Sequence, residues 1–474
     1  MVLSLPPLRR WTRYRRSKIL SPIEKTSVID PHSPYRLNYS DHVTHLAEIR
    51  YAALAAADPW RAVTRNLRLV RHDILAGPHN IELKPNSRIY LVALGKAAPA
   101  MCQAAAEVLG ERLTTGIAAI PHDYTDPLPP GIKPHPAGHP LPDKGSLAAG
   151  QAVYDLLSAT RPDDLVLVLI SGGGSAMLEL PVPDVNLEDL RTLNTLLLHS
   201  GAPIETINTV RQAVSQTKAG GLARMASPAP VVALILSDVV GDRLSTIASG
   251  PTVLRKFPTR KEKWGVAMPQ TARGVLEHFS IWDLAPQGVR TALGRPEAPQ
   301  PRARRPLNIL IGSNRQVVNA AADRAVNLGF KPRVISFRMR GEARDVGYRL
   351  GRSLCRAKRP ACLLMGGEST VTVLGDGRGG RNQELALSAA LVLESTPNTV
   401  VMALATDGVD GPTDAAGAIV SSQTISQAHA LGLDPVSALE QNNAYPLLEA
   451  IGALLRTGPT GTNLNDLVVG LAYS

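Results

Sequence analysis

The chain has 474 residues, of which 44% are hydrophobic and 19% are charged, and its mean hydropathy is close to zero. This composition is typical of a folded globular protein with two or three domains, and it excludes intrinsic disorder for the chain as a whole. No apolar run reaches the roughly 18 residues of a membrane-spanning helix. We therefore expect a protein without a transmembrane segment.

The net charge of +11 is unevenly distributed, because six of the surplus positive charges precede the first acidic residue, Glu24. Aromatic residues make up only 4% of the chain, and no zinc-finger, RNP or helix-turn-helix pattern occurs, so we do not expect nucleic-acid binding. We interpret residues 1–38 as a disordered basic extension. An organellar transit peptide is the alternative, because the part before Glu24 is rich in Arg and free of acidic residues.

The three cysteines, Cys102, Cys355 and Cys362, form no CxxC pair and are too few for a disulfide framework. They indicate a reducing compartment and no structural zinc. We expect a cytoplasmic protein, unless the basic extension is a targeting signal. The expected partners are small molecules rather than membranes or nucleic acids, and homo-oligomer formation stays open.

From about Tyr39 onward, short apolar runs alternate with longer amphipathic stretches, which is the pattern of an α/β fold. A helix is expected after Asn186 as its N-cap, ending at Gly201. The runs of Val, Ile and Leu predict parallel strands covered on both faces. In chain order, the expected strands are Ile89–Leu94, Leu165–Ile170, Val231–Leu236, Leu307–Ile311, Arg333–Phe337, Ala361–Met365 and Val400–Ala405.

The segment 294–306, GRPEAPQPRARRP, is rich in Pro and Arg, lacks periodicity and separates two blocks of strands and helices. We therefore expect an N-terminal α/β domain over residues 40–293 and a C-terminal α/β domain over residues 306–474. Both are expected to contain largely parallel sheets, with an active-site cleft between them.

Glycine and polar residues follow six of the expected strands, and in open parallel sheets ligands collect at this edge. The segment Ser171, Gly172, Gly173, Gly174 and Ser175 follows one of these strands. Its three glycines let neighbouring backbone N–H groups turn toward one phosphate group. A tight strand-to-loop turn is the alternative, and no Walker A sequence occurs in the chain.

Cationic residues occupy two further strand ends. Lys96 directly follows the first expected strand among small residues, where a cation needs an anionic partner. The loop 375–381 places Arg378 and Arg381 among glycines before a helix, and Glu368 follows the preceding strand. Charge and backbone donors together suit phosphate binding. The alternatives are a lysine that reaches water at a helix start and a flexible surface loop.

Two groups of aspartates also follow strands, Asp238 with Asp242, and Asp407 with Asp410 and Asp414. Carboxylates near Lys, Arg and glycine-rich loops indicate a divalent cation such as Mg²⁺ that bridges phosphate oxygens. We assign metal binding to Asp238 and Asp242, and a metal or general-base role to Asp407. As single residues, turn formers and helix caps are the alternative.

Eight segments occur in order between about residue 45 and the end of the chain: VALGKAAPAM, GHPLPDKGS, LISGGGSAML, NTVRQAVSQTKAGGLA, LSDVVGDRLSTIASGPT, GGESTVTVLGDGRGGRNQELAL, ATDGVDGPTDAAGAIV and GPTGTNLNDLVV. Together they resemble the class II glycerate 2-kinase family, whose C-terminal half is the MOFRL domain.

The resemblance implies an enzyme with Mg²⁺ that transfers phosphate from ATP to D-glycerate and gives 2-phosphoglycerate. It implies that Lys96 and Arg381 are the principal cationic catalytic residues. Arg211 and Lys218 resemble family positions near the cleft, where they could bind the glycerate carboxylate or a phosphate. Their spacing of seven would place them on one helical face, and a solvated basic face is the alternative.

A hydroxypyruvate reductase dependent on NAD(P)H is the competing enzyme, because Gly375, Gly377 and Gly380 match the GxGxxG pattern and a helix is expected next. The match is weak, since the loop contains Arg378 and lies late in the chain. A reductase would also have little use for two groups of aspartates. A sugar-acid sensor without catalysis would share the pocket but would not turn substrate over. The sequence therefore predicts a kinase.

Overall fold

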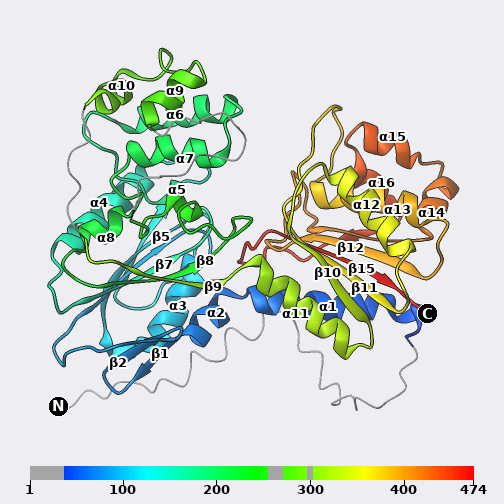
Figure 1. Cartoon of the computed structure of the whole chain (residues 1–474), viewed down its shortest axis with the longest axis horizontal. Helices are drawn as coiled ribbons and strands as arrows, with labels where there is room; N and C mark the ends of the chain where they lie inside the picture. Colours follow the sequence, from blue (N-terminus) through cyan, green and yellow to red (C-terminus); the bar gives the residue numbers. More distant parts are fainter. Residues whose placement is uncertain (1–36, 255–270, 296–302) are drawn as a thin grey trace. The chain divides into compact units, whose positions relative to one another are not determined.

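The structure is a computed structural model, and it describes residues 37–254, 271–295 and 303–474 (Figure 1). These residues form two sheets of six strands each and one small sheet of three strands. Nearly all of the basic extension expected over residues 1–38 lies outside the described residues. Among the residues that are described, no helix is long and apolar enough to cross a membrane.

The first large sheet is fully parallel, with the strand order β6-β5-β4-β7-β8-β9. This agrees with the predicted parallel α/β sheet. The elements up to this sheet's last strand are η2 (Tyr39–Asp41), α1 (His42–Ala57), α2 (Pro59–Asn66), β1 (Leu67–Val70), β2 (Asp73–Ala76), β3 (His79–Ile81), β4 (Ile89–Leu94), α3 (Ala98–Leu109), η3 (Gly110–Arg112), β5 (Leu113–Pro121), β6 (Ile132–Ala137), α4 (Lys144–Ser158), β7 (Leu165–Ile170), α5 (Gly174–Met177), α6 (Leu187–His199), α7 (Ile204–Ala213), α8 (Gly221–Met225), β8 (Val231–Leu236), η4 (Ile247–Ser249), α9 (Ala272–His278), α10 (Gln287–Gly294) and β9 (Leu307–Gly312).

The central strands of this sheet, β4, β7 and β8, are buried along their whole length. Their alternate residues face opposite sides, so a strand buried on both faces needs apolar side chains at every position. Val153 of α4 and Leu222 of α8 belong to the core on one face, and α3 packs on β4, β5 and β7. The helices therefore fix the three strand ends that carry the predicted site residues.

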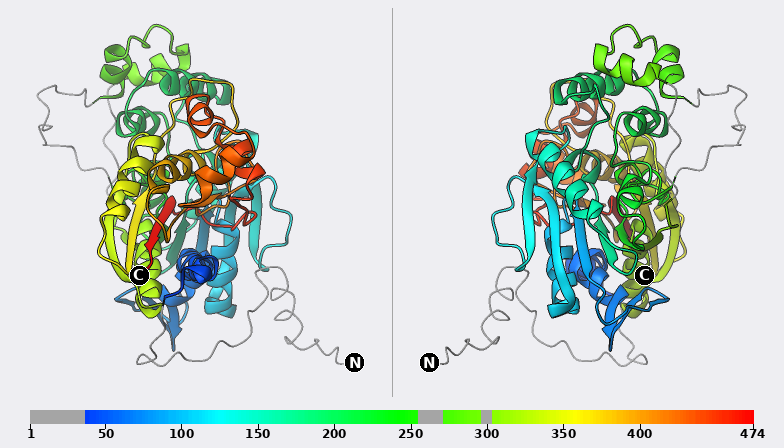
Figure 2. Two further views of the ribbon diagram at one scale, coloured as in Figure 1. Left: turned by 90° about the vertical axis from the view of Figure 1, so that its right-hand side faces the viewer. Right: turned by 90° about the vertical axis from the view of Figure 1, so that its left-hand side faces the viewer.

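Four helices, α6, α7, α9 and α10, form a separate apolar cluster beyond the carboxyl ends of the first sheet (Figures 1 and 2). Helix α6 begins after Asn186 as predicted. The Asn186 side chain accepts the amide of Asp189, and the Asp189 side chain accepts the amide of Asn186, which is a capping box. This layer holds Arg211, one of the predicted site residues, on α7.

The second large sheet has the strand order β10-β11-β15-β12-β13-β14. Helices α12 and α13 pack closely together, because any Cβ at Gly347 would lie 2.1 Å from the Leu385 carbonyl oxygen. Both helices contribute to the core of this sheet. The elements of this block are α11 (Asn314–Asn327), β10 (Lys331–Met339), α12 (Ala343–Cys355), β11 (Ala361–Gly367), α13 (Arg381–Leu393), β12 (Thr399–Ala405), β13 (Gly417–Ser421), α14 (Thr424–Ala430), α15 (Pro435–Glu440), α16 (Ala444–Ala450), β14 (Leu454–Leu455) and β15 (Asp466–Ala472).

The strand directions of the second sheet differ from the predicted largely parallel arrangement. Only β10 and β11 pair in parallel, and the other neighbours are antiparallel. The last strand, β15, inserts between β11 and β12. The sequence did not reveal the antiparallel pairing, because a strand that is buried on both faces is an apolar run whether its neighbours are parallel or antiparallel to it. The α/β class of both blocks is confirmed.

The predicted start of the second domain at residue 306 requires a correction. Strand β9 follows the Pro-rich segment, yet it pairs in parallel with β8 and is the edge strand of the first sheet. The change from one sheet to the other therefore comes after Gly312. Residues 296–302, within the predicted boundary segment, lie outside the described residues.

Helix α1 belongs by sequence to the first block but packs on helix α11 of the second (Figure 1). Glu48 of α1 forms an ion pair with Arg324 of α11. His45 Nδ1 lies 3.0 Å from the hydroxyl of Tyr473, and Phe330 packs edge-on against both rings. Helix α1 is therefore attached to Tyr473, the residue that directly follows β15.

Candidate active site

The carboxyl ends of β4 and β7 are joined through Ser171. Its hydroxyl accepts the Ala97 amide at 3.1 Å and donates to the Leu94 carbonyl at 3.2 Å, and the Lys96 amide donates to the Gly172 carbonyl at 2.8 Å. The Ser171 hydroxyl, which lies in the predicted phosphate-binding segment, is therefore engaged in linking the two loops. The Lys96 side chain is exposed and forms no ion pair within the described part of the chain.

The glycine loop after β7 has the backbone of an anion-binding nest. Gly173 has a φ of 84°, and the amides of Gly172 and Gly173 donate to no acceptor among the described residues. Gly174 then begins the short helix α5. Neighbouring free amides beside a residue in the left-handed region make a concave group of donors, which suits a phosphate. The predicted role of the loop remains consistent with this geometry.

His139 and Ser175 flank the glycine loop. A Cβ at Gly173 would lie 3.0 Å from His139 Cδ2, and burial, with a smaller contribution from Lys96, lowers the His139 pKa. The Ser175 hydroxyl lies 2.8 Å from that of Ser249, which donates to Asn208. Ser249 has a φ of 60°, a conformation that a non-glycine residue keeps only when its surroundings enforce it.

Asp238 follows β8 and lies against the glycine loop, where a Cβ on Gly172 would approach its Oδ2 to 2.2 Å. Burial is the largest effect on the Asp238 carboxyl and raises its pKa, the nearby Glu368 carboxylate acts in the same direction, and the Lys96 ammonium opposes both, so that the pKa is about 6 overall. Lys96, Gly172 and Asp238 are therefore brought together by three neighbouring parallel strands, as the sequence predicted.

The second block contributes a charged network centred on Arg381, the first residue of α13. Its guanidinium donates to both carboxylate oxygens of the fully buried Asp466, at 2.7 and 2.8 Å, and lies 3.3 Å from Glu368. Burial lowers the pKa of Arg381, but the hydrogen bonds and the charges of Asp466 and Glu368 outweigh this effect and raise it overall. Arg381 is therefore held in one geometry.

Asn465 connects this network with Asp238. Its side-chain amide donates to the Asp238 carbonyl oxygen at 2.8 Å and to Glu368 at 3.2 Å. The Asn465 Oδ1 atom is buried and has no hydrogen-bond partner. A buried oxygen without a donor, in a side chain that contacts the Glu368 carboxylate and the Asp238 main-chain carbonyl, is a place where a cation or a bound substrate can supply the missing interaction.

The three aspartates after β12 do not form one cluster. The buried Asp410 carboxylate accepts the amides of Asn382 and Gln383 at 3.0 and 2.9 Å, so it caps helix α13. Asp414 binds Tyr445 and Arg456 at the surface. Asp407 accepts the Val409 amide at 3.1 Å. The turn and cap alternative therefore explains the hydrogen bonds of Asp410 and Asp407.

Asp242 has a φ of 55° and lies in the turn that ends with the hydrogen bond from its amide to the Val239 carbonyl. No described contact brings its carboxylate to Asp238, whose acidic neighbour is Glu368 instead.

Within the described ranges, no group of three His, Cys, Asp or Glu side chains could hold a metal ion by itself. A Mg²⁺ ion needs only one or two carboxylates when phosphate oxygens and water complete its shell. Asp238, Glu368 and the free Asn465 oxygen fit that donor set.

Arg211 and Lys218 do not share a helical face, because α7 ends at Ala213 and Lys218 lies in the following loop. Both nevertheless lie near Glu179. The buried Lys218 ammonium forms an ion pair with Glu179, and Arg211 donates to Asn194 at 2.7 Å. Burial lowers the pKa of Arg211, against the attraction of Glu179. Lys218 is therefore already neutralised within the protein.

The loop that matched GxGxxG is used for packing. A Cβ at Gly375 or Gly377 would lie 2.6 or 2.3 Å from the Gln441 carbonyl oxygen. The Arg378 guanidinium stacks 4.2 Å from the centre of the ring of Tyr445, whose hydroxyl donates to Asp414. The loop also does not follow β11 directly, since that strand ends at Gly367. These features differ from a dinucleotide-binding turn between a strand and a helix.

Residues of both blocks line one small cavity at the glycine loop. Lys96, Ser171, Gly172 and Leu236 come from the first sheet, and Thr462 and Asn463 precede β15. We assigned no site role to the residues before β15 from the sequence, although they belong to the segment GPTGTNLNDLVV, one of the eight that carry the resemblance. Their signal was a polar run, TNLND, directly before a buried strand, and Asn465 and Asp466 of this run make the contacts described above.

Residues 45–294 match the family described as a domain of unknown function, DUF4147, and residues 361–466 match the MOFRL family. The chain is 40% identical to a glycerate 2-kinase of Pyrococcus horikoshii, over 89% of this chain and 95% of that protein. It is 41% identical to a D-glycerate 2-kinase of Thermotoga maritima, over 90% and 97% of the two chains.

A crystal structure of a Thermotoga maritima glycerate kinase superposes on this fold with a TM-score of 0.80 and 38% identity, covering 91% of this chain and all of that chain. Both halves of the chain thus match known families, and single relatives extend across both halves. The similarity also includes the fold of both sheets. The chain therefore belongs to the class II glycerate 2-kinase family, and its residues 361–466 belong to the MOFRL family.

Proposed function

We propose that this protein is a glycerate 2-kinase that transfers the γ-phosphoryl group of ATP to the C2 hydroxyl of D-glycerate and releases 2-phosphoglycerate. The observation that carries the proposal is the meeting of Lys96, the free amides of Gly172 and Gly173, and the Asp238 carboxylate at one sheet edge. These are the parts that phosphoryl transfer requires, namely amide donors and a cation for phosphate oxygens and a carboxylate for a metal ion.

In this mechanism the glycine loop holds a phosphate of ATP, while Lys96 neutralises charge that develops on the transferred group. Arg381 is positioned by Asp466 and adds a second cation. Phosphoryl transfer involves little covalent chemistry by the protein, so such charge and positioning account for most of the rate.

Asp238 and Glu368 are the residues that would hold Mg²⁺. When bound there, Mg²⁺ would neutralise phosphate oxygens of ATP. Above pH 6 the Asp238 carboxylate is ionised and available for this role. Asp242 and Asp407, which we also assigned from the sequence, are less suitable, since turn geometry already accounts for the Asp407 contact.

The cavity between Lys96 and Asn463 has a volume of about 10 Å³, which is far below the size of a nucleotide. We infer that the segment before β15 moves away from the glycine loop to admit ATP and glycerate and then closes again. Closure would exclude water and limit ATP hydrolysis. If a separately expressed segment 40–312, which includes the edge strand β9, phosphorylated glycerate at full rate, this two-block site would be wrong.

The decisive experiment incubates the purified full chain with D-glycerate, ATP and Mg²⁺ and identifies the product by ³¹P NMR. We expect 2-phosphoglycerate, and no product in the presence of a chelator. Lys96→Ala should lose activity, while Lys133→Ala, at another exposed lysine of the same sheet, should keep it. Formation of 3-phosphoglycerate would contradict the proposed regiochemistry. The reductase would be favoured if the protein oxidised NADH in the presence of hydroxypyruvate but formed no phosphoglycerate from glycerate and ATP.

We also infer that the enzyme works in the cytoplasm. Cys102 and Cys362 are buried thiols, Cys355 is partly buried, and none of the three forms a disulfide. Fractionation of the source cells would test this location, and accumulation in an organelle would instead assign a targeting role to the basic extension.

A further inference from the structure

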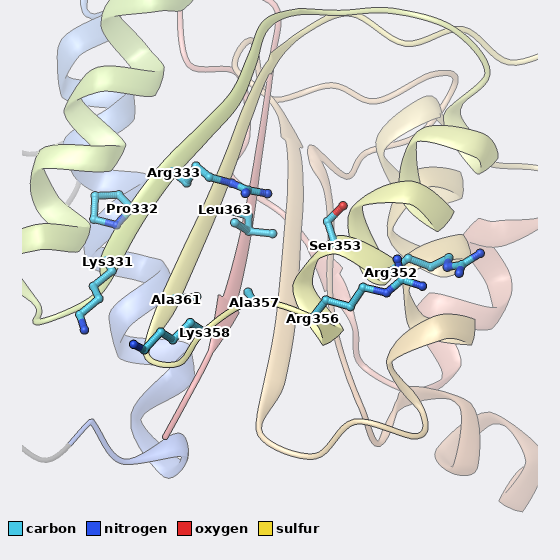
Figure 3. A pocket seen from close by; sticks show the side chains of 10 residues that line it. All are labelled: Lys331, Pro332, Arg333, Arg352, Ser353, Arg356, Ala357, Lys358, Ala361 and Leu363. Carbon is cyan, nitrogen blue, oxygen red and sulfur yellow. The ribbon is translucent and has the colours of Figure 1, made fainter.

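A second cavity lies far along the strands from the candidate active site, at the amino ends of β10 and β11 and beside the last turn of α12 (Figure 3). Its volume is about 620 Å³. Sites for small molecules typically have volumes of about 300–1,000 Å³. Glu368 follows the opposite, carboxyl end of β11, so this cavity is separate from the site described above.

All of the charged residues that line the cavity are cationic. Its lining contains no Asp or Glu, and no ion pair to a carboxylate involves its cations in the described part of the chain. Gathered like charges repel one another, and an anion that neutralises several of them is bound with a favourable free energy. The cationic lining residues are Lys331, Arg333, Arg352, Arg356 and Lys358.

These side chains surround an apolar centre. Figure 3 shows Arg333 reaching from β10 toward Leu363, Lys331 and Lys358 on one side of the cavity, and Arg356 on the side of α12. Ala357, Ala361 and Leu363 lie between them. The arrangement suits a ligand that has an apolar body and several anionic groups at its edge.

General rules of secondary structure explain only parts of this arrangement. Cations are favoured at helix C-termini, which accounts for Arg352 in the last turn of α12 and Arg356 at its C-cap. Charged residues protect edge strands from pairing, which accounts for Lys331 and Arg333 on β10. Neither rule explains why no acidic residue lines the cavity, although the chain contains 40 Asp and Glu residues.

We propose that this cavity binds a small organic polyanion of nucleotide size that carries two or more phosphate groups. Arginine guanidinium groups bind phosphate through paired hydrogen bonds, and lysines add point charges. A single phosphate would neutralise only part of the five cations. The ligand would occupy the second block without touching Lys96, the glycine loop or Arg381.

Calorimetric titration of the full chain, in metal-free buffer containing a chelator, tests the proposal. The probes are inorganic tripolyphosphate, for the phosphate chemistry, and ADP, for the contribution of the apolar centre. The variant is the double substitution Arg333→Gln and Arg356→Gln. The matched control is Arg349→Gln, which removes an exposed arginine of α12 that does not line the cavity.

We expect the wild-type chain to bind one more equivalent of tripolyphosphate than the double variant, with Arg349→Gln behaving as the wild type. The double variant should keep the wild-type kcat for glycerate, which shows that it is folded and separates this site from the proposed active site. Equal stoichiometry and Kd in the wild type and the double variant would overturn the proposal. The proposal would also be overturned if the double variant lost binding to a single-stranded oligonucleotide but kept binding to tripolyphosphate. The surface would then recognise nucleic acid.

Discussion

Substitution of Gly172 by Ala tests the central contact of the candidate active site. The added Cβ would lie 2.2 Å from Asp238 Oδ2 and 2.8 Å from its Cγ. Real Cβ atoms essentially never approach another heavy atom below 3.0 Å, so the carboxylate must move by about 0.8 Å, the difference between 3.0 and 2.2 Å. A displacement of about 1 Å in a catalytic constellation can cost about 10²-fold in rate, or about 2.7 kcal/mol.

The same substitution should also lower stability by roughly 1–3 kcal/mol, because an extra methyl group is forced into a packed site. The assays are steady-state kinetics with ATP and glycerate and thermal unfolding of the same preparation. Gly294→Ala is the matched control, since a Cβ there meets nothing within 4 Å. Wild-type kcat/KM and Tm in Gly172→Ala would refute the placement of the Asp238 carboxylate against the glycine loop.

Three further variants separate catalysis from stability. Lys96→Ala should lower kcat by about 10² to 10³ with an unchanged Tm, since the Lys96 side chain has no ion-pair partner in the described chain. Arg381→Ala should lower kcat similarly and also destabilise the fold by roughly 3 kcal/mol, because it leaves the buried Asp466 carboxylate unpaired. Near-normal kcat in both variants would contradict the mechanism. Wild-type kcat/KM should rise with pH through about 6 as Asp238 ionises. Because its folded pKa is raised from 3.8 to about 6, ionisation of Asp238 should lower wild-type stability as the pH rises from about 4 to 6. The buried Asp466 carboxyl, whose pKa is also raised to about 6, adds a fall of its own over this range. Asp238→Asn should therefore make the total fall smaller by up to about 3 kcal/mol by calorimetry, and an unchanged stability profile would contradict this reasoning.

Local patterns in the sequence were sufficient for the parts of the fold that depend on local physics. The buried strands β4, β7 and β8, the capping box at Asn186 and the glycine loop were all predictable, because each follows from the residues of one short segment. The meeting of Lys96 with Asp238 was also predictable, since neighbouring parallel strands bring their carboxyl ends to one edge.

Features that depend on pairing between distant segments were not predictable in this way. The assignment of β9 to the first sheet depends on which strand it meets, and the segment before it reads equally well as a domain boundary. Asp466 and Glu179 were missed, because a single carboxylate in the sequence does not reveal that it will bind Arg381 or Lys218. Asp410 was assigned to a cluster, whereas its position beside the first turn of α13 makes it a cap.

The position of β15 in the second sheet has a consequence for how the protein is made. This strand is the last one in the chain, yet it lies in the interior of the sheet between β11 and β12 and carries Asp466, which holds Arg381. The first sheet needs nothing beyond β9 and can form while the ribosome is still translating, as N-terminal domains generally do. The second sheet cannot be completed until β15 has been synthesised, and until then β11 and β12 are unpaired along the edges that β15 fills. Lys96 can therefore take its place with the first sheet, whereas the geometry of Arg381 is fixed only once β15 has been added and Asp466 can hold it.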